Sequence, residues 1–106
     1  MSYDLFVEPE VHDARRDLPG NLRQRIRRLI ESLASAPRPA ESQPLQFSET
    51  DLPTGIELRR IRIDRWRIIY AVSDADQWVW LLAIRRRPPY DYNDLPELVG
   101  RLPRPA

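Results

Sequence analysis

The stretch that decides the fold runs from Gly55 to Tyr92. Its first part reads GIELRRIRIDRWRIIYAV (55–72), and after a polar turn its second part reads WVWLLAIRRRPPYDY (78–92). Long apolar runs rich in β-branched residues predict strands. Eight arginines accompany these runs: Arg59, Arg60, Arg62, Arg65, Arg67, Arg85, Arg86 and Arg87. Guanidinium groups held on a stiff sheet beside tyrosines favour a phosphate-rich ligand.

Alternation along this stretch predicts three antiparallel strands joined by short turns. Ile61 and Ile63 would face one side of the first strand, with Arg60 and Arg62 on the other. A tight turn at Asp64-Arg65 leads into the second strand, where Arg67 points away from four apolar residues, Trp66, Ile68, Tyr70 and Val72. Residues 78–84 are almost wholly apolar, which is typical of a central strand covered on both faces.

The first half of the chain predicts elements that pack on this sheet. Residues 3–7 read as a strand, and Pro9 suits the first turn of a short helix that Pro19-Gly20 ends. A second helix is expected from about residue 22 to 36, capped by Asn21, because apolar residues recur there every three or four positions. The fold class is therefore α+β: an N-terminal strand, a helical hairpin, then an antiparallel three-stranded meander.

Three further segments have weaker patterns. We expect a short edge element at Leu45–Phe47 and one or two helical turns at Asp94–Gly100. The tail after Gly100 is expected to be frayed.

Composition narrows the class of protein. A chain of 106 residues has room for one domain, which we assign to residues 1–106, and 42% hydrophobic residues are ordinary for a folded soluble protein. The net charge is only +1, but all 17 basic residues are arginine, and within the segments Arg59–Arg67 and Arg85–Arg87 the only acid is Asp64. One face is therefore expected to be basic in a nearly neutral protein.

Other classes of site find no support in the sequence. There is no cysteine, no leader-like start and no apolar run long enough to span a membrane, so a cytoplasmic protein without a membrane partner is expected. His12 is the sole histidine and reads as a surface residue, and the carboxylates have no metal-ligand spacing. We expect neither a metal nor a cofactor.

The order of these elements resembles the RelE/ParE toxin superfamily of bacterial toxin–antitoxin systems. The landmarks are the Leu18-Pro19-Gly20 junction between the helices and the Leu33…Pro37 ending of the second helix. Two more are the strand pair LRRIRIDRWRIIY (58–70) and the closing IRRRPPY (84–90). The resemblance covers nearly the whole chain. It implies either a RelE-like toxin that cleaves mRNA in the ribosomal A site, or a ParE-like toxin that inhibits DNA gyrase without being an enzyme.

The resemblance also implies site residues. By position in the family motifs, the residues of an endoribonuclease are Arg60, Arg67, Arg86 and Tyr90. Arg62 would help from the Arg60 face, and phosphate contacts would extend to Arg85, Arg87 and Tyr92. Two assignments stay open. The arginine after the last strand can be Arg85 or Arg87 in place of Arg86, and the tyrosine can be Tyr92 in place of Tyr90. Arg85 stands where many relatives have histidine, so one general acid or base is missing.

The residue types fit RNA cleavage by the 2′-hydroxyl. This reaction needs a base, charge on the pentacoordinate phosphate and an acid for the leaving oxygen. Arginine stays protonated and supplies charge, whereas Tyr90 could act as the base if nearby guanidiniums lowered its pKa from about 10. Arg67 is expected outside the core, while Arg59 and Arg65 read as solvated strand residues whose loss would change little.

The implied partners follow from the same resemblance. They are a cognate antitoxin, the ribosome with its mRNA, and a toxin–antitoxin hetero-oligomer that binds operator DNA through the antitoxin. Exposed apolar strand and helix surface would offer a groove to a disordered acidic or amphipathic segment. Alternatively, the antitoxin would displace the segment Tyr90–Gly100.

Overall fold

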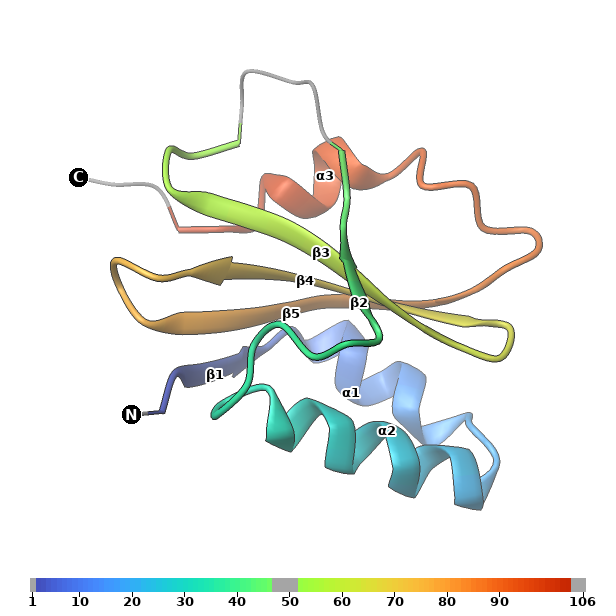
Figure 1. The fold of residues 1–106 in the computed structure, drawn as a ribbon. Helices are drawn as coiled ribbons and strands as arrows, with labels where there is room; N and C mark the ends of the chain where they lie inside the picture. Colours follow the sequence, from blue (N-terminus) through green and yellow to red (C-terminus); the bar gives the residue numbers. More distant parts are fainter. Residues whose placement is uncertain (1, 47–51, 104–106) are drawn as a thin grey trace.

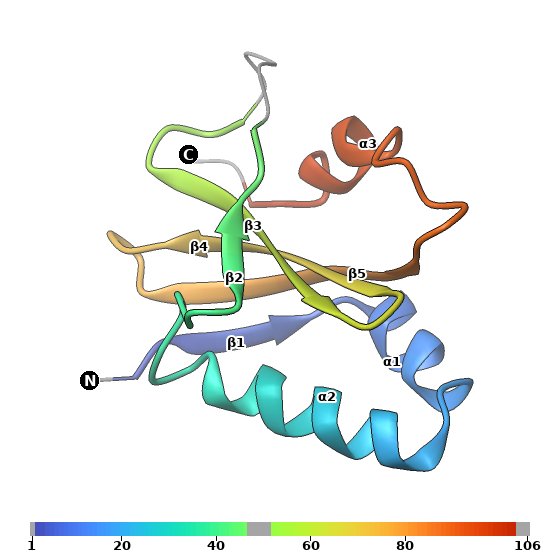
Figure 2. The ribbon, with the colours of Figure 1, turned by 45° about the vertical axis from the view of Figure 1, so that its right-hand side comes forward.

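A five-stranded sheet in the order β1-β5-β4-β3-β2 carries helices on both faces. The computed structural model describes residues 2–46 and 52–103 (Figure 1). In chain order the elements are β1 (Asp4–Val7), α1 (Pro9–Arg16), α2 (Gly20–Ser32), β2 (Ser42–Pro44), β3 (Ile56–Ile63), β4 (Trp66–Ser73), β5 (Trp78–Arg86) and α3 (Leu95–Val99). Figures 1 and 2 show α1 and α2 on one side of the sheet and α3 on the other. This confirms the α+β class.

The central meander confirms the predicted strands and their turns. Strands β3, β4 and β5 pair in antiparallel order, and the turn Asp64-Arg65 places Ile63 opposite Trp66. Asp64 adopts a positive φ of 51°, as one turn residue of a tight hairpin must. The sheet is larger than the meander because β1 pairs with β5 in parallel and β2 pairs with β3.

The helical hairpin buries the alternating face that the sequence predicts. Its apolar stripe, including Ile26, Ile30 and Leu33, packs against the sheet residues Ile61, Ile63, Ile68, Tyr70, Val72, Val79, Leu81 and Ile84. The helix starts two residues earlier than expected, at Gly20, and no side chain caps it, so the cap predicted at Asn21 is wrong. It ends at Ser32 because the last turn tightens at Leu33, before Pro37.

The opposite face of the sheet is covered by the C-terminal segment. Leu95, Leu98, Val99 and Leu102 are buried against Leu58, Ile69, Ala71, Leu82 and Ala83. Leu102 is 3% exposed, so the tail expected to fray is packed at this position. None of the helices in the described ranges is long and apolar enough to cross a lipid bilayer.

A β-bulge in β5 changes which of its residues face α3. Ile69 pairs with Ala83 but Tyr70 pairs with Leu81, so Leu82 is the extra residue. Leu82 and Ala83 therefore both contact the α3 side, whereas Leu81 and Ile84 both face the helical hairpin. Beyond the bulge, odd-numbered residues such as Arg85 lie on the α3 side.

The edge strand β2 replaces the expected element at Leu45–Phe47. It ends at Pro44, although the Leu45 amide still donates to the Leu58 carbonyl at 2.8 Å; Phe47 lies outside the described residues. Arg59 is 8% exposed beneath this edge, where its Nε and Nη2 donate to Ser42 Oγ at 3.1 and 2.8 Å. Its Nη1 donates to Glu57 at 3.0 Å. The expectation that Arg59 is solvated is therefore wrong, because β2 covers it, while Arg65 is exposed as expected.

Arg59→Ala should lower the free energy of unfolding by about 1–3 kcal/mol, because Ser42 Oγ and Glu57 lose the hydrogen bonds that the buried Arg59 donates. Arg65→Ala removes the same charge from an exposed turn and should stay within about 0.5 kcal/mol of the wild type. Urea unfolding of the two variants measures the difference. Equal stability of both would contradict the structural role given to Arg59.

Candidate functional site

Three arginines occupy directly paired positions on three neighbouring strands. Arg62 of β3 pairs with Arg67 of β4, and Arg67 pairs with Arg85 of β5. Directly paired residues project from the same face with Cβ atoms roughly 5 Å apart. We call Arg62, Arg67 and Arg85 the arginine row. It lies on the α3 side of the sheet, next to the β3–β4 turn.

The members of the arginine row differ in exposure. Arg67 is only 8% exposed, and its Nη1 donates to the carbonyl oxygens of Asp64 at 3.2 Å and Trp66 at 3.0 Å. The expectation that Arg67 lies outside the core is therefore wrong, because the guanidinium folds back against the turn. Arg62, by contrast, is exposed. Like charges placed opposite each other destabilise a sheet, so the row is a site where an anion is favoured.

Arg85 is held by two carboxylates that come from distant parts of the chain. Its Nη2 lies 3.3 Å from Glu10 of α1 and 3.2 Å from Asp94, which precedes α3. Its Nε also donates to Asp94 at 3.2 Å. Glu10 additionally forms an ion pair with Arg101, which follows α3. We call Glu10, Arg85, Asp94 and Arg101 the carboxylate clamp, since it ties α1, β5 and the C-terminal segment together.

Tyr90 joins the clamp through its hydroxyl, which donates to Asp94 Oδ1 at 2.5 Å. Burial, followed by this hydrogen bond, raises the pKa of Tyr90 well above its ordinary value near 10. The Arg85 guanidinium, 5.9 Å from the ring centroid, acts in the opposite direction but is the weaker influence. The expected lowering of this pKa is therefore wrong in this conformation, and the phenol is a hydrogen-bond donor at neutral pH.

Tyr92 packs beside Tyr90 but points its hydroxyl elsewhere. The two rings lie 4.7 Å apart at 59°, and Arg87 stands 5.3 Å over the Tyr92 ring. Tyr92 has a positive φ of 65°. Within the described chain, its buried hydroxyl oxygen has no hydrogen-bond partner. The geometry brings Tyr90, and not Tyr92, to Asp94 and Arg85.

The remaining candidate arginines surround the row without joining it. Arg60 faces the same side but pairs with Ile69, one step diagonally from Arg67, and its Nη2 donates to Gln43 at 2.9 Å. Arg86 pairs with Trp66, so it projects to the helical-hairpin side. Of the three alternatives at the end of β5, Arg85 is therefore the one that aligns with Arg67.

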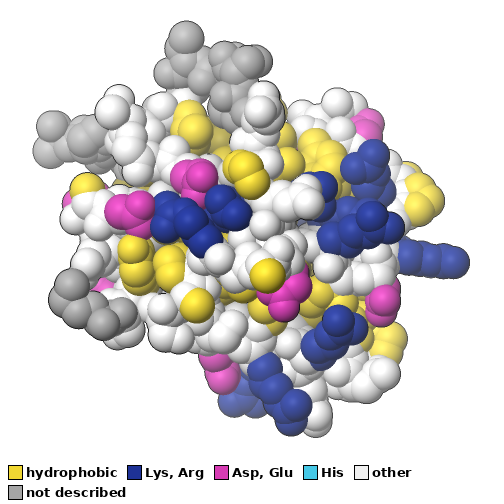
Figure 3. Space-filling view, in the orientation of Figure 1, with side chains coloured by type: hydrophobic (Ala, Val, Ile, Leu, Met, Phe, Trp, Pro, Cys, Tyr) yellow, Lys and Arg dark blue, Asp and Glu magenta, His cyan; other side chains and the backbone are white. Residues whose placement is uncertain are grey.

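Charge on the surface follows this arrangement. Arg62, Arg65, Arg86 and Arg87 are exposed around the β3–β4 turn and the end of β5. Figure 3 shows basic side chains gathered over the right-hand part of the molecule, where Figure 1 places the β3–β4 turn, and again over α2. The basic face expected from the sequence is thus present at one end of the sheet.

Sequence reasoning missed both carboxylates of the clamp. Glu10 is separated from Arg85 by 75 positions, and its only local signal is an acidic residue in the first turn of a helix. Asp94 follows Tyr90 by four positions, and this spacing predicts no contact unless the conformation of the intervening loop is known. The parallel pairing of β1 with β5, which brings α1 to the end of β5, is the missing information.

Comparison with known proteins decides the family. A family model described as ParE toxin of type II toxin-antitoxin system, parDE, matches residues 10–88. The chain belongs to the RelE/ParE toxin superfamily. It is therefore a toxin of a type II toxin–antitoxin system. A comparison with curated proteins returned no match.

Solved structures of RelE toxins share the fold. A chain of the archaeal RelE–RelB complex from Pyrococcus horikoshii OT3 superposes with a TM-score of 0.71 at 24% identity, covering 85% of this chain and 100% of that one. The Mycobacterium tuberculosis RelBE2 toxin–antitoxin complex gives 0.63 at 16%, with 82% and 100% covered. A free E. coli RelE with two arginines replaced by alanine gives 0.60 at 14%, with 95% and 97% covered. At these identities the likeness shows the fold alone.

The state of Tyr90 can be measured by absorbance of the phenolate near 295 nm. The difference titration between the wild type and Tyr90→Phe should show no ionisation of Tyr90 until the pH is well above 10, because burial and the Asp94 hydrogen bond favour the neutral phenol. In urea the same difference should appear near the ordinary pKa of about 10. A folded-state transition near pH 8 would contradict the assignment.

Proposed function

We propose that this toxin is a ribosome-dependent endoribonuclease that cleaves mRNA. The observation that supports the proposal is the arginine row on adjacent strands, bordered by further exposed arginines at the end of the sheet. Such an array matches the spaced negative charges of an RNA backbone. The proposal follows the RelE-like branch that the sequence resembles.

In this proposal, arginine charge is the main catalytic contribution. The 2′-hydroxyl loses its proton to solvent water and attacks the adjacent phosphate, and the row stabilises the additional negative charge of the pentacoordinate state. Arg62 is exposed and can contact the substrate directly, whereas Arg67 is held rigidly by the turn carbonyls. Tyr90, being neutral, donates a hydrogen bond to the phosphate or a proton to the leaving 5′-oxygen. The ribosome would position the substrate.

Gyrase inhibition without catalysis is the second candidate. Two observations favour it: the matching family model carries the ParE description, and Tyr90 in this conformation is a poor base. Under this alternative, the arginines at the end of the sheet would contact a protein or DNA surface of gyrase.

The first test compares Arg62→Ala and Tyr90→Phe with Arg16→Ala. Removing a charge contact to a transition state costs about 10²–10³ in rate, so Arg62→Ala should lose most cleavage of mRNA on translating ribosomes. Tyr90→Phe should retain ribosome binding and lose cleavage. Arg16 is 78% exposed at the end of α1, and its replacement should leave cleavage unchanged. Arg67→Ala is less informative because that side chain is buried.

RNA-end mapping and gyrase supercoiling assays on the same purified proteins separate the two candidates. If no new mRNA ends appear and supercoiling is inhibited, the nuclease proposal is wrong. If ends appear and Arg62→Ala still produces them at the wild-type rate, the role of the arginine row is wrong.

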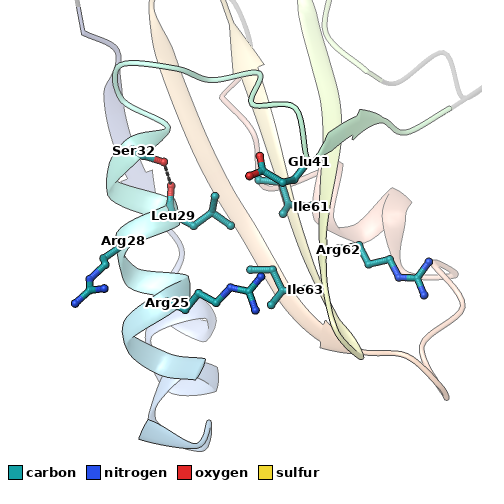
Figure 4. A pocket seen from close by; sticks show the side chains of 8 residues that line it. All are labelled: Arg25, Arg28, Leu29, Ser32, Glu41, Ile61, Arg62 and Ile63. Carbon is teal, nitrogen blue, oxygen red and sulfur yellow. Dashed lines mark hydrogen bonds between the residues drawn. The ribbon is translucent and has the colours of Figure 1, made fainter. Parts of the chain in front are cut away.

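We further propose that a cognate antitoxin occupies the groove between α2 and β3. The groove encloses about 320 Å³, with an apolar floor of Leu29, Ile61 and Ile63. Its rim carries Arg25, Arg28, Arg62 and Glu41. Figure 4 shows Leu29 pointing from α2 toward the strands and Arg25 reaching toward Ile63, while Arg28 and Arg62 point outward on either side. An amphipathic segment with acidic residues at its edges fits this chemistry.

Charge reversal on the rim tests the antitoxin site. The double variant Arg25→Glu/Arg28→Glu should remain toxic but lose rescue by the small protein encoded beside it, because the acidic edge of that segment would be repelled. Arg23→Glu changes an exposed residue of the same helix outside the groove and should still be rescued. Growth on co-expression measures both. Full rescue of the double variant would contradict this location.

A further inference from the structure

The carboxylate clamp occupies the end of the arginine row that a phosphate would need. Arg85 offers its Nε and Nη2 to Asp94 and its Nη2 to Glu10, so the edge of its guanidinium is already engaged. Guanidinium recognises carboxylate and phosphate oxygens through the same fork of donors. Asp94 and Glu10 therefore bind Arg85 through the same donors that an anionic ligand would use.

We propose that Glu10 and Asp94 are internal competitors of the RNA phosphate, and that they hold the segment from Tyr90 to Leu102 as an autoinhibitory strap over the end of the arginine row. This inference rests on the proposed function, since it concerns the same arginines. It adds a regulated step: an anion gains Arg85 only in exchange for the carboxylates of Asp94 and Glu10.

The contacts of the clamp are suited to exchange. The distances from Arg85 to the two carboxylates are 3.2 and 3.3 Å, longer than the roughly 2.7–2.9 Å of an optimal charge-assisted hydrogen bond. The side chains of Arg85, Glu10 and Asp94 are 26%, 34% and 26% exposed, so solvent screens the pairs. A polyanion that brings several phosphates at once can compete for such a guanidinium.

Release of Asp94 also changes Tyr90. The Tyr90 hydroxyl donates to the same carboxylate that engages Arg85, on its other oxygen. When Asp94 leaves, the phenol loses its acceptor and Arg85 keeps Glu10 as its carboxylate partner, so both groups become more available together at adjacent positions of the site. Movement of the strap therefore changes the availability of the Arg85 guanidinium and of the Tyr90 hydroxyl in the same step.

The apolar part of the strap limits how far it opens. Leu95, Leu98 and Leu102 stay buried against the sheet, and Arg101 is paired with Glu97 as well as Glu10. Release therefore needs only the loop from Tyr90 to Asp94 to move, while α3 stays docked. Loss of the clamp carboxylates should accordingly leave the fold intact.

The test measures binding of a ten-nucleotide single-stranded RNA by fluorescence anisotropy at several salt concentrations. Asp94→Asn should bind about twofold to fivefold more tightly than Glu97→Gln, a gain within the range of one partly exposed ion pair. Glu97 is the matched control because it belongs to α3, loses the same charge on substitution, and forms its ion pair with Arg101 and not with Arg85. The dependence of log K on log salt should steepen by about 0.7 in Asp94→Asn, the value expected for one added phosphate contact.

Glu10→Gln removes the other carboxylate, which comes from α1, and should tighten RNA binding in the same way. Thermal unfolding of each variant checks that the protein is folded. If the wild type binds RNA and both clamp variants match Glu97→Gln in affinity and salt dependence, the strap is wrong and the proposed function stands. If neither the wild type nor any variant binds RNA at low salt, the strap is wrong, and the proposed function is judged separately by mapping mRNA ends on translating ribosomes.

Discussion

The register of the β3–β4 hairpin is the constraint on which the rest of the site depends. The two-residue turn Asp64-Arg65 sets Ile63 opposite Trp66, and this places Arg62 opposite Arg67. The same register directs the apolar alternate residues of both strands onto the helical hairpin. A slip by one residue would send the arginines into that core and the isoleucines to the α3 side, so packing and site are specified together.

The fold was predictable from the sequence because its strongest signals are local. The alternation around Ile61, Ile63, Trp66 and Ile68, the helical stripe before Leu33 and the turn at Asp64-Arg65 each follow from neighbouring residues. The site was predictable only in part. Arg62 and Arg67 follow from alternation, but strict alternation from Trp80 and Leu82 would direct Arg86 to the face where Arg85 lies. The bulge at Leu82 reverses this, and nothing in the apolar run WVWLLAI marks the extra residue.

Other errors share a cause, which is contact between residues far apart in the chain. Arg59 looks like a solvated strand residue until β2 covers it. Tyr90 has arginines as sequence neighbours, yet burial and Asp94 raise its pKa. Glu10 lies near Arg85 only because β1 pairs in parallel with β5. Sequence periodicity reports the face on which a residue lies, but it does not report what else reaches that face.

The structure also reconciles a nearly neutral chain with a ligand rich in phosphate. Carboxylates neutralise arginines at both ends of the sheet, through Glu57 and Asp74 on Arg38 and through Glu10 and Asp94 on Arg85. The end that holds Arg85 differs from the other because four further arginines are exposed around it: Arg62, Arg65, Arg86 and Arg87. The basic end is therefore a local property that net charge hides.

The central claim is that the arginine row binds phosphate, and NMR of the arginine side chains tests it most directly. In a titration of arginine-labelled protein with a short single-stranded RNA, the Nε–Hε signals of Arg62, Arg67 and Arg85 should shift most, and those of Arg16 and Arg23 should stay in place. Shifts confined to the arginines of α2, or spread evenly over all exposed arginines, would contradict the claim.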